Sequence, residues 1–510
     1  MDTKKLRQKI LDLAIHGKLV PQDPNDEPAS VLLERIRAEK ERLITEGKIK
    51  RSKKSCANRE QSQTCLNSAE MQPRLAEGKS AASDTSHYEN VPFEVPEGWC
   101  WCSISDICSK IGSGSTPRGS NYAEHGIPFF RSQNVYNDGL VYNDIKYISE
   151  DVHKSMIGTE VLPKDLLLNI TGGSLGRCAV VPSDFKKGNV SQHVCILRTV
   201  QVLPEYLHCF IISDYFSDTM ILSGSGREGL PKYSLEAMMI PIPPLAEQSR
   251  IVSSIVQLIT FVNSIEGSIT DILQSVQVAK SKILDLAIRG KLVPQNASDE
   301  PASELLKRIN PKAVASCDNP HYAEPYRLPH GWTWIELGKL AVDSADGPFG
   351  SNLKKEHYTT NNEVRIIQLS NIGENGWRDE NTKYTTFEHL SEISRSEVKS
   401  GDIVIAKMMP AGRAILCPNF DLKYVLSSDA VKFVLPEGIC NEYILNSINS
   451  SVFREQVYDN VQGVTRVRTS LQKLRTYVLP IPPYNEQLRI VEKVNDLFSQ
   501  LDMIEKSLQA

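Results

Sequence analysis

A segment of 27 residues occurs twice in this chain, once near its N-terminus and once in its middle. The first copy, ILDLAIHGKLVPQDPNDEPASVLLERI at 10–36, and the second, ILDLAIRGKLVPQNASDEPASELLKRI at 283–309, are identical at 21 positions and align without a gap. Two copies are too few for a solenoid, which needs three or more repeats to bury a continuous core. The duplication therefore predicts two units of one design that close on each other.

Further pairs of segments extend the repeat over most of the chain. EVPEGWCW at 94–101 corresponds to RLPHGWTW at 327–334, and PIPPLAEQSRIV at 241–252 corresponds to PIPPYNEQLRIV at 480–491. The offset between the copies falls from 273 to 233 residues ahead of the first of these pairs, so the first copy holds about 40 extra residues. This extra segment is polar and poor in aromatic residues, which predicts a flexible insert at 48–91.

Apolar residues spaced alternately by four and three positions follow each PIPP motif. This spacing over 251–286 and again over 490–508 is typical of a coiled-coil seam. Gly267 is expected either to bend the first of these helices or to divide it into a hairpin. The second seam stops at the C-terminus, and its continuation lies at the other end of the chain, at Leu6, Ile10 and Leu13. The pattern predicts a cyclic two-fold repeat that is opened inside one helical spacer, with its ends side by side.

The stretch between each GW motif and the following PIPP motif has short β-like runs and short helices. We expect strands at DLLLNI (165–170), HVCILRTV (193–200), DIVIAK (402–407) and AVKFVLP (430–436), and helices at 205–216 and 442–453. The predicted fold class is α+β, with two duplicated α+β domains joined by long antiparallel coiled-coil-like helical spacers. The predicted division is an N-terminal half-spacer (1–47), the insert (48–91), a first globular domain (92–245), a central spacer (246–310), a linker (311–324), a second globular domain (325–484) and a C-terminal half-spacer (485–510).

Composition limits the class of protein and its surroundings. The formal net charge of −4 argues against a uniformly basic surface, so a nucleic-acid-binding face would be a local concentration of Lys and Arg. Eleven cysteines without a CxxC pair predict reduced, buried thiols and not a metal site. The N-terminus carries charges within its apolar stretch, unlike a signal peptide, and we find no apolar run long enough for a membrane span. The sequence predicts a cytoplasmic protein with no membrane contact.

Enzyme signatures are incomplete wherever the sequence approaches them. The IPPY at 481–484 has Ile481 where an amino-methyltransferase has a polar residue to accept from the exocyclic amine. The glycine-rich ITGGSLGR at 170–177 lacks the lysine and spacing of a phosphate-binding loop, and no HExxH is present. A strand edge explains Asp402 and Lys407, and a helix surface explains His16. We expect no catalytic residue and no metal ligand in this chain.

Loops rich in Gly, Ser, Arg, Asn and Gln occur at matching places in the two globular domains. Arg and Lys pair with guanine edges, Asn and Gln with adenine, and Ser or Thr with phosphates. Hydrophilic turns would explain any single residue, but the recurrence of the set with different side chains favours binding to double-stranded DNA. The candidate DNA-binding residues are Ser113, Thr116, Arg118, Asn121, Tyr122, Arg131, Asn134, Ser174, Arg177, Gln192, Arg227 and Lys232 in the first domain, and Asn352, Lys354, Gln368, Asn371, Lys407, Arg413, Ser428, Arg466 and Arg468 in the second.

The ordered pair of motif sets resembles the specificity subunit of type I restriction-modification systems. The resemblance rests on the PEGW and PHGW motifs at the start of each globular domain and the two PIPP(L/Y)xEQxxIV motifs at its end. It rests also on the heptad spacers and on the LxLAIxGKLVPQ segments with DEPAS after them. It covers nearly the whole chain. It implies two target recognition domains, each reading one half of a split, asymmetric DNA sequence. The N-terminal spacer ahead of the first domain and the insert depart from the commonest arrangement of the family.

The resemblance also implies partners and cofactors. Two methyltransferase subunits are expected on the helical spacers and two motor-nuclease subunits where such subunits are present, with S-adenosylmethionine, ATP and Mg bound by these partners and no cofactor bound by this chain. The spacer is expected to set the distance between the half-sites. Two alternatives stay open: a helical scaffold that does not read DNA, and an enzyme with its own methyltransferase centre. The basic run at 48–54 is expected either to touch DNA phosphates or to be a solvated linker.

Overall fold

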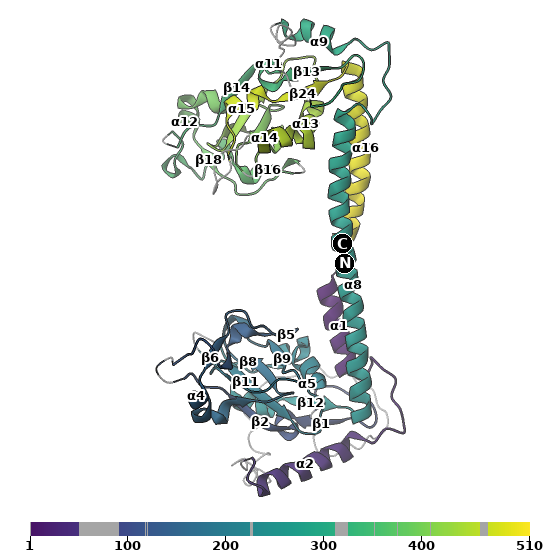
Figure 1. Cartoon of the computed structure of the whole chain (residues 1–510), viewed down its shortest axis with the longest axis vertical. Helices are drawn as coiled ribbons and strands as arrows, with labels where there is room; N and C mark the ends of the chain where they lie inside the picture. Colours follow the sequence, from purple (N-terminus) through teal and green to yellow (C-terminus); the bar gives the residue numbers. More distant parts are fainter. Residues whose placement is uncertain are drawn as a thin grey trace. The chain divides into compact units, whose positions relative to one another are not determined.

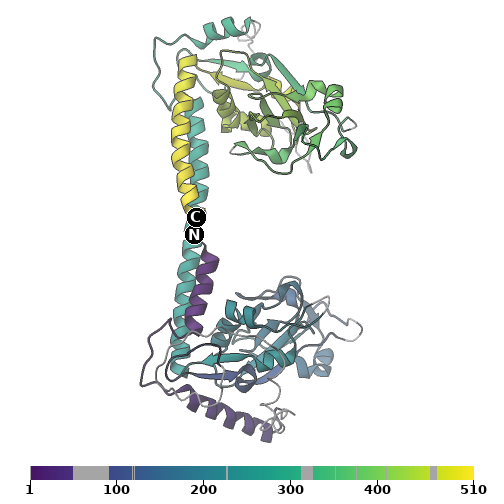
Figure 2. The same cartoon turned by 180° about the vertical axis from the view of Figure 1, so that it is seen from behind.

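The computed structural model describes residues 2–49, 91–117, 119, 121–224, 228–311, 325–350, 352–374, 376–408, 410–459 and 468–509. It contains two compact units, Asp2–Gly267 and Ser268–Ala510. Figure 1 draws the chain with its elements labelled, and Figure 2 draws it from behind. Nearly all of the predicted insert, and the linker from 312 onward, lie outside the described residues.

Helix packing in the first unit joins the N-terminus to a distant part of the sequence. Helix α1 (Thr3–Ile15) lies along the first half of α8 (Leu245–Ile288) (Figure 1). The Arg7 guanidinium contacts Glu266 at 2.7 Å. The apolar side chains that α1 and α8 contribute to the core of this unit are Ile10, Leu11, Ala14, Ile15, Ile251, Ile255 and Val262. This packing of α1 on α8 agrees with the coiled-coil-like helical spacers that the sequence predicts.

The second unit repeats this packing with its own helices. Helix α16 (Tyr484–Gln509) lies along the second half of α8, and Ile490, Val491 and Val494 join Leu284 and Ala287 in one buried cluster. Lys280 Nζ contacts Asp502 and Glu505 at 2.6 and 3.2 Å. Helices α2 (Ala29–Thr45) and α9 (Ala302–Ile309) follow the repeated GKLVPQ segments.

Helix α8 runs through Gly267 without a break, so the alternative of a hairpin at this glycine was wrong. Glycine costs about 1 kcal/mol in a helix interior, which the apolar seam on both sides offsets. By length and composition alone α8 could also cross a membrane. A helix that packs its apolar seam against α1 and α16 satisfies the same criterion, so this is weak evidence for a span.

A buried polar junction fastens the first globular domain to α8. Trp99 Nε1 donates to Glu247 Oε2 at 3.0 Å, and Gln22 Nε2 donates to Glu247 Oε1 at 3.2 Å. Arg250, one turn further along α8, pairs with Asp26 at 2.5 Å. Glu247 is 1% exposed, and burial raises the pKa of its carboxyl. Each carboxylate oxygen therefore has its own donor.

The second unit has the same junction at the corresponding positions. Trp332 Nε1 donates to Glu486 Oε2 at 3.1 Å, and Gln295 Nε2 donates to Glu486 Oε1 at 3.3 Å. Arg489 pairs with Asp299 at 2.7 Å. The repeated GW, GKLVPQ and PIPPxxEQ motifs of the sequence are the segments that supply these residues. The motifs recur because their residues form the same buried polar junction in both units.

Each globular domain contains one antiparallel sheet, one sheet of mixed strand direction and two short two-stranded pairs. In domain 1, the ribbon β1–β12 closes the domain, and the sheets have the orders β2-β11-β8-β9 and β6-β3-β10-β7, with the β4–β5 hairpin beside them. The strands are β1 (Cys100–Ser103), β2 (Cys108–Ser113), β3 (Ile127–Phe130), β4 (Val135–Tyr136), β5 (Gly139–Leu140), β6 (Lys146–Ile148), β7 (Glu160–Val161), β8 (Leu166–Asn169), β9 (Cys178–Val180), β10 (Gly188–Val190), β11 (Val194–Thr199) and β12 (Met239–Ile242).

Domain 2 has the same topology in the same chain order. Its ribbon is β13–β24, its sheets are β14-β23-β20-β21 and β18-β15-β22-β19, and its hairpin is β16–β17. The strands are β13 (Thr333–Glu336), β14 (Asp343–Asp346), β15 (Val364–Ile367), β16 (Ile372–Gly373), β17 (Gly376–Trp377), β18 (Tyr384–Thr385), β19 (Glu397–Val398), β20 (Ile403–Ala406), β21 (Ala414–Leu416), β22 (Lys423–Leu426), β23 (Ala430–Val434) and β24 (Val478–Ile481). The predicted α+β class with duplicated domains and a long helical spacer is confirmed.

The helices expected at 205–216 and 442–453 are each divided in two. Ser213 ends the first and caps the second in domain 1, where its Oγ accepts from Phe216 N at 3.3 Å, and Ser450 ends the first helix in domain 2. The helices of the two domains are α3 (Ile104–Ile107), α4 (Glu150–Ser155), α5 (Pro204–Ile211), α6 (Asp214–Thr219), α7 (Lys232–Ala237), α11 (Leu337–Leu340), α12 (Phe387–Glu392), α13 (Asn441–Asn449), α14 (Ser451–Asp459) and α15 (Leu471–Thr476).

Candidate nucleic-acid interface

Strand directions bring the predicted DNA-binding loops of domain 1 to one edge. Ser113 at the end of β2 and Leu168 near the end of β8 both pair with Cys195 at the start of β11. In the other sheet β3 and β10 run parallel, with Phe130 beside Val190 at their ends. The described parts of the loops that meet here are 113–117, 119, 121–122, 131–134, 170–177 and 191–193, which we call strand-end surface 1.

Domain 2 forms the equivalent edge. Asp346 at the end of β14 and Ile405 near the end of β20 pair with Val431 at the start of β23. Strands β15 and β22 run parallel, with Ile367 beside Leu426. The described parts of the loops that meet here are 347–350, 352–357, 368–371, 407–408, 410–413 and 427–429, which we call strand-end surface 2.

Both surfaces depend on a glycine where two sheets meet. A Cβ on Gly114 would lie 1.8 Å from the carbonyl oxygen of Val190, and a Cβ on Gly347 would lie 1.8 Å from that of Ser427. No side chain fits at such distances, so the backbones approach only with glycine. The loops that begin directly after these glycines, at Ser115 and Pro348, therefore leave the sheets from matching positions.

Several candidate residues of strand-end surface 1 are open to solvent. Ser113, Thr116, Asn121 and Gln192 are exposed, whereas Tyr122 is half-buried. The Tyr122 ring packs 5.7 Å from that of Phe129, so it supports the loop that carries Asn121. Lys232, at the start of α7, is exposed and contacts Glu236 at 3.3 Å. The exposed members present hydroxyl and amide groups of the kind that pair with bases and phosphates.

Among the described residues, no carboxylate forms an ion pair with Arg131 or Arg177 on strand-end surface 1. The Arg177 guanidinium lies 4.7 Å from the centre of the Tyr136 ring, which is exposed on the β4–β5 hairpin. Arg131 donates to the carbonyl oxygen of Asp144 at 2.6 Å. Both arginines therefore keep donors that are not neutralised by an acid.

A hydroxyl–imidazole pair on this surface was missed by the sequence analysis. Thr171 Oγ1 and His193 Nδ1 lie 2.8 Å apart, and the Ser174 hydroxyl accepts from Asn169 Nδ2 at 3.2 Å. The strand ends of β8 and β11 bring these residues together across 22 positions of sequence. Nothing in the local residue pattern of either segment predicts this pairing.

The structure does not support DNA contact by Asn134 or Asn371. Both are fully buried, and each holds a tight turn together. Asn134 accepts from Arg131 N at 3.1 Å and donates to two carbonyl oxygens, at 3.0 and 3.2 Å. Asn371 does the same with Gln368 N at 2.9 Å and carbonyl oxygens at 3.0 and 2.6 Å. Their amide groups are fully used inside the domain, so the prediction is corrected: both are structural residues.

Cations of strand-end surface 2 are partly neutralised. Lys407 Nζ contacts Asp346 at 2.7 Å, and Arg468 contacts Asp429 at 3.0 Å. Lys407 is largely buried whereas Arg468 is exposed. An ion pair of this kind can open toward a phosphate or orient the cation toward a base. The remaining candidates here are Asn352, Lys354 and Ser428, which are exposed, and Gln368 and Arg413, which are half-buried.

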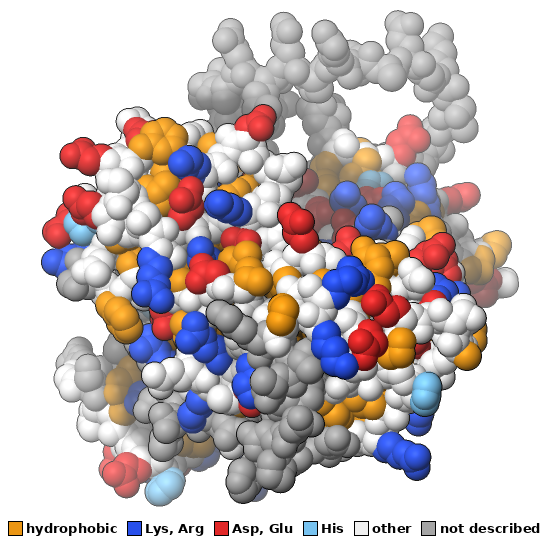
Figure 3. Space-filling view, turned by 90° about the horizontal axis from the view of Figure 1, so that it is seen from above, with side chains coloured by type: hydrophobic (Ala, Val, Ile, Leu, Met, Phe, Trp, Pro, Cys, Tyr) orange, Lys and Arg blue, Asp and Glu red, His pale blue; other side chains and the backbone are white. Residues whose placement is uncertain are grey.

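Arg118, Arg227 and Arg466 lie outside the described residues. On the face drawn in Figure 3, Lys and Arg side chains are interspersed with Asp and Glu, in keeping with the small net charge. Within the described part of the chain, no group of three or more His, Cys, Asp or Glu could hold a metal ion. The cysteines described are free thiols.

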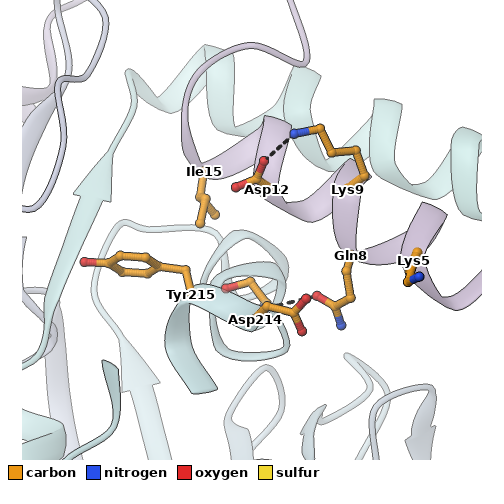
Figure 4. A pocket seen from close by; sticks show the side chains of 8 residues that line it. Lys5, Gln8, Lys9, Asp12, Ile15, Asp214 and Tyr215 are labelled. Atoms are coloured by element: carbon orange, nitrogen blue, oxygen red, sulfur yellow. Dashed lines mark hydrogen bonds and ion pairs between the residues drawn. The ribbon is translucent and has the colours of Figure 1, made fainter. Parts of the chain in front are cut away.

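A shallow hollow of about 260 Å³ lies between α1 and α6, and none of its lining residues belongs to strand-end surface 1. Figure 4 shows the pairing of Lys9 with Asp12 and the contact of Gln8 with Asp214 at this hollow. Lys9 pairs with Asp12 at 2.8 Å, and the Gln8 amide accepts from Asp214 N at 3.1 Å and donates to Ile212 O at 3.2 Å. The two Gln8 contacts fasten α1 to domain 1, which explains the hollow as a helix-packing seam.

Comparisons with known proteins agree with this architecture. Residues 96–274 and 343–510 match a family model described as the type I restriction modification DNA specificity domain. The chain is 26% identical to the type I restriction enzyme EcoEI specificity subunit of Escherichia coli, over 99% of this chain and 91% of that protein. It is 28% identical to the EcoAI specificity subunit of the same species, over 97% and 88%. A chain from a solved type I R-M system, studied for complex assembly and conformational transition, has the same fold with a TM-score of 0.58 at 17% identity, over 82% of this chain and 94% of that chain.

Proposed function

Since this chain belongs to the type I restriction-modification DNA specificity family, we propose that it selects the DNA sequence on which a type I restriction-modification complex acts. The chain is a non-catalytic specificity subunit, and methylation and cleavage belong to other subunits. Domain 1 and domain 2 each read one half of a bipartite, asymmetric DNA site. The proposal extends to individual residues: the exposed candidates of each strand-end surface contact the half-site read by that domain.

One observation carries the proposal. The two domains repeat the same strand order and the same glycine-dependent edge, while the side chains at that edge differ. Strand-end surface 1 offers Gln192 and Arg177, which has no carboxylate partner among the described residues. Strand-end surface 2 offers Ser428 and cations paired with Asp346 and Asp429. A shared backbone with different side chains is what two readers of two different half-sites require.

The helices supply the surface for partner subunits. Exposed apolar side chains occur along both α8 and α16, outside the buried seams that these helices form. These side chains are Val256, Phe261, Ile272, Val278, Leu488, Met503 and Ile504. We assign this surface to two methyltransferase subunits, which bind S-adenosylmethionine, with two motor-nuclease subunits using ATP and Mg where they are present. The assembly works on DNA in the cytoplasm, without a membrane.

The competing function is a helical scaffold that gathers protein partners without reading DNA. The exposed apolar side chains of α8 and α16 favour partner docking under both functions, so they do not separate the two. The duplicated edges with different side chains favour DNA reading, since a scaffold has no use for them. A scaffold would also show little dependence of DNA binding on salt.

Modified-base sequencing tests the function directly. Cells expressing this chain with its methyltransferase subunit should contain methylated adenines in a split motif, and cells lacking this chain alone should lose them. Persistence of the same motif without this chain would overturn the proposal and leave the scaffold as the better account.

A further inference from the structure

Three arginines and one carboxylate gather beside strand-end surface 2. Arg454, on α14, donates to Glu374 Oε2 at 2.7 Å, and Arg413 Nε lies 3.9 Å from Glu374 Oε1. Arg378 is close enough to Arg413 to disfavour its charge, as is Arg454. We call Arg378, Arg413 and Arg454 the arginine cluster. Its members come from the β16–β17 hairpin, the β20–β21 turn and α14, so only the fold brings them together.

Backbone and amide contacts hold the cluster in place. Asn449 donates to Ala414 O and accepts from Ala414 N, both at 3.0 Å, which fixes the residue directly after Arg413. The same Asn449 Oδ1 accepts from Arg454 at 3.2 Å. Gly373 leaves room for Arg378, whose Nε would lie 2.8 Å from a Cβ at that position. The cluster is therefore positioned before any ligand binds.

The cluster carries more positive charge than its surroundings neutralise. Glu374 is the carboxylate that pairs with Arg413 and Arg454 within the described residues. The Nε atoms of Arg413 and Arg454 are buried and have no hydrogen-bond partner among those residues. Burial lowers the pKa of the Arg413 guanidinium, and the charges of Arg378 and Arg454 lower it further. Buried cations of one sign with unused donors are stabilised by an added anion.

Domain 1 lacks the cluster. The residues at the corresponding positions of its hairpin and helix are Asn137, Val141 and Ser217, and only Arg177 matches an arginine, Arg413. Asn137 accepts from Cys178 N at 3.1 Å, so it fixes the strand and carries no charge. The difference marks the cluster as a feature of the reader in domain 2 and not of the shared scaffold.

We propose that the arginine cluster binds one phosphate of the DNA backbone beside the half-site read by domain 2. This inference rests on the proposed function and adds to it a contact that positions the duplex without reading its sequence. Planar guanidinium groups offer parallel N–H donors that match phosphate oxygens, and the β20–β21 turn that carries Arg413 belongs to strand-end surface 2. Glu374 holds Arg413 and Arg454 apart from each other until the phosphate is bound.

Arg378→Ala tests the phosphate contact with little risk to folding, because Arg378 is exposed. The complex of the full chain with its methyltransferase subunits is titrated with cognate and unrelated duplexes from 50 to 200 mM salt. The variant should bind both duplexes roughly threefold more weakly at low salt, with a salt slope smaller by about one and an unchanged preference between the duplexes. Lys423→Ala, which removes an exposed cation at the opposite end of β22, is the matched control and should leave the slope unchanged.

Duplexes with a single neutral methylphosphonate locate the contact. The wild-type complex should lose affinity at one phosphate beside the half-site of domain 2, and Arg378→Ala should be insensitive to that substitution. Equal salt slopes for wild type and variant, or equal sensitivity to every methylphosphonate, would overturn the phosphate contact. If the phosphate contact is overturned but the wild-type complex still prefers the cognate duplex, the proposed function stands. If the wild-type complex shows no preference between the duplexes, the result contradicts both the phosphate contact and the proposed function.

Discussion

The indole nitrogen of Trp99 donates to the carboxylate of Glu247 at 3.0 Å, although the two residues lie 148 positions apart in the sequence. Trp99 lies near the start of domain 1 and Glu247 lies in the first turn of α8, so this bond joins the globular domain to the helix. The second unit repeats the bond between Trp332 and Glu486 at 3.1 Å. The orientation of each reading surface on its own helix depends on one such buried bond and its neighbours.

Glu247→Gln should therefore destabilise the first unit. A glutamine has one acceptor oxygen where Glu247 accepts from both Trp99 and Gln22, so one donor loses its partner. The expected loss is about 1.5–3 kcal/mol, typical of a hydrogen bond to a charged group. Calorimetry on the purified complex measures it. Glu486→Gln should destabilise the second unit in the same way. Glu492→Gln, at an exposed position of α16, should leave the melting temperature unchanged. Equal melting temperatures for all three variants and wild type would contradict the stabilising role of the polar junction.

The helical spacers and the duplicated domains could be predicted from the sequence. The spacers follow from the local spacing of apolar residues, and the duplicated domains follow from the repeated segments. The four-three spacing of apolar residues predicted α8 and α16, and the β-like runs at 165–170 and 402–407 became β8 and β20. The buried polar junction itself could not be predicted. Trp99, Gln22 and Glu247 belong to three motifs, and only the fold shows that these motifs meet.

The candidate site was predicted less well than the fold. Asn134 looks like a base-reading amide in sequence, but the same amide also suits a tight turn, and burial decides between the two roles. Arg378 and Arg454 were missed because they lie on a hairpin and a helix outside the loops rich in glycine and serine. Residue type and local spacing indicate which loops are functional, whereas tertiary packing determines which side chains remain available.

Asn134→Ala should reduce stability and not merely DNA affinity. It would leave Arg131 N and the carbonyl oxygens of Val141 and Asn143 without their amide partner inside the domain, at a cost of about 1–3 kcal/mol. Thermal unfolding without DNA measures this loss. Gln192→Ala is the matched control on the same surface, and it should lower DNA affinity while leaving the melting temperature unchanged. Full stability of the Asn134 variant would show that the turn does not need the amide.

Arg177→Ala should relax recognition of the half-site read by domain 1 alone. The guanidinium is held over the Tyr136 ring without a carboxylate, so its donors are available to a base edge. The expected loss of discrimination is about 1–3 kcal/mol at one base position. Competition binding with duplexes changed one position at a time reads it out. Arg177→Lys keeps the charge but loses the planar fork, and should resemble alanine; equal loss at both half-sites would contradict the assignment.

Buried thiols should make the protein resistant to thiol reagents up to alkaline pH. Burial raises the pKa of Cys108, Cys195, Cys209 and Cys417 from 9 to about 12. A raised folded-state pKa adds stability that is complete below pH 9 and is lost as the pH rises toward 12. The urea midpoint should therefore fall over that range, and these cysteines should react slowly with iodoacetamide at pH 8, followed by peptide mapping. Rapid alkylation of the native protein at these four positions would contradict the burial.

The central claim is that two domains of one design each read half of a DNA site, in opposite senses on the two strands. A variant in which residues 92–245 also replace residues 325–484 tests it most directly, because it carries two copies of domain 1. Modified-base sequencing of cells expressing this variant with its methyltransferase subunit should yield a palindromic split motif, built from the half-site of domain 1 and its reverse complement. An unchanged asymmetric motif from a variant that still methylates DNA would contradict the account.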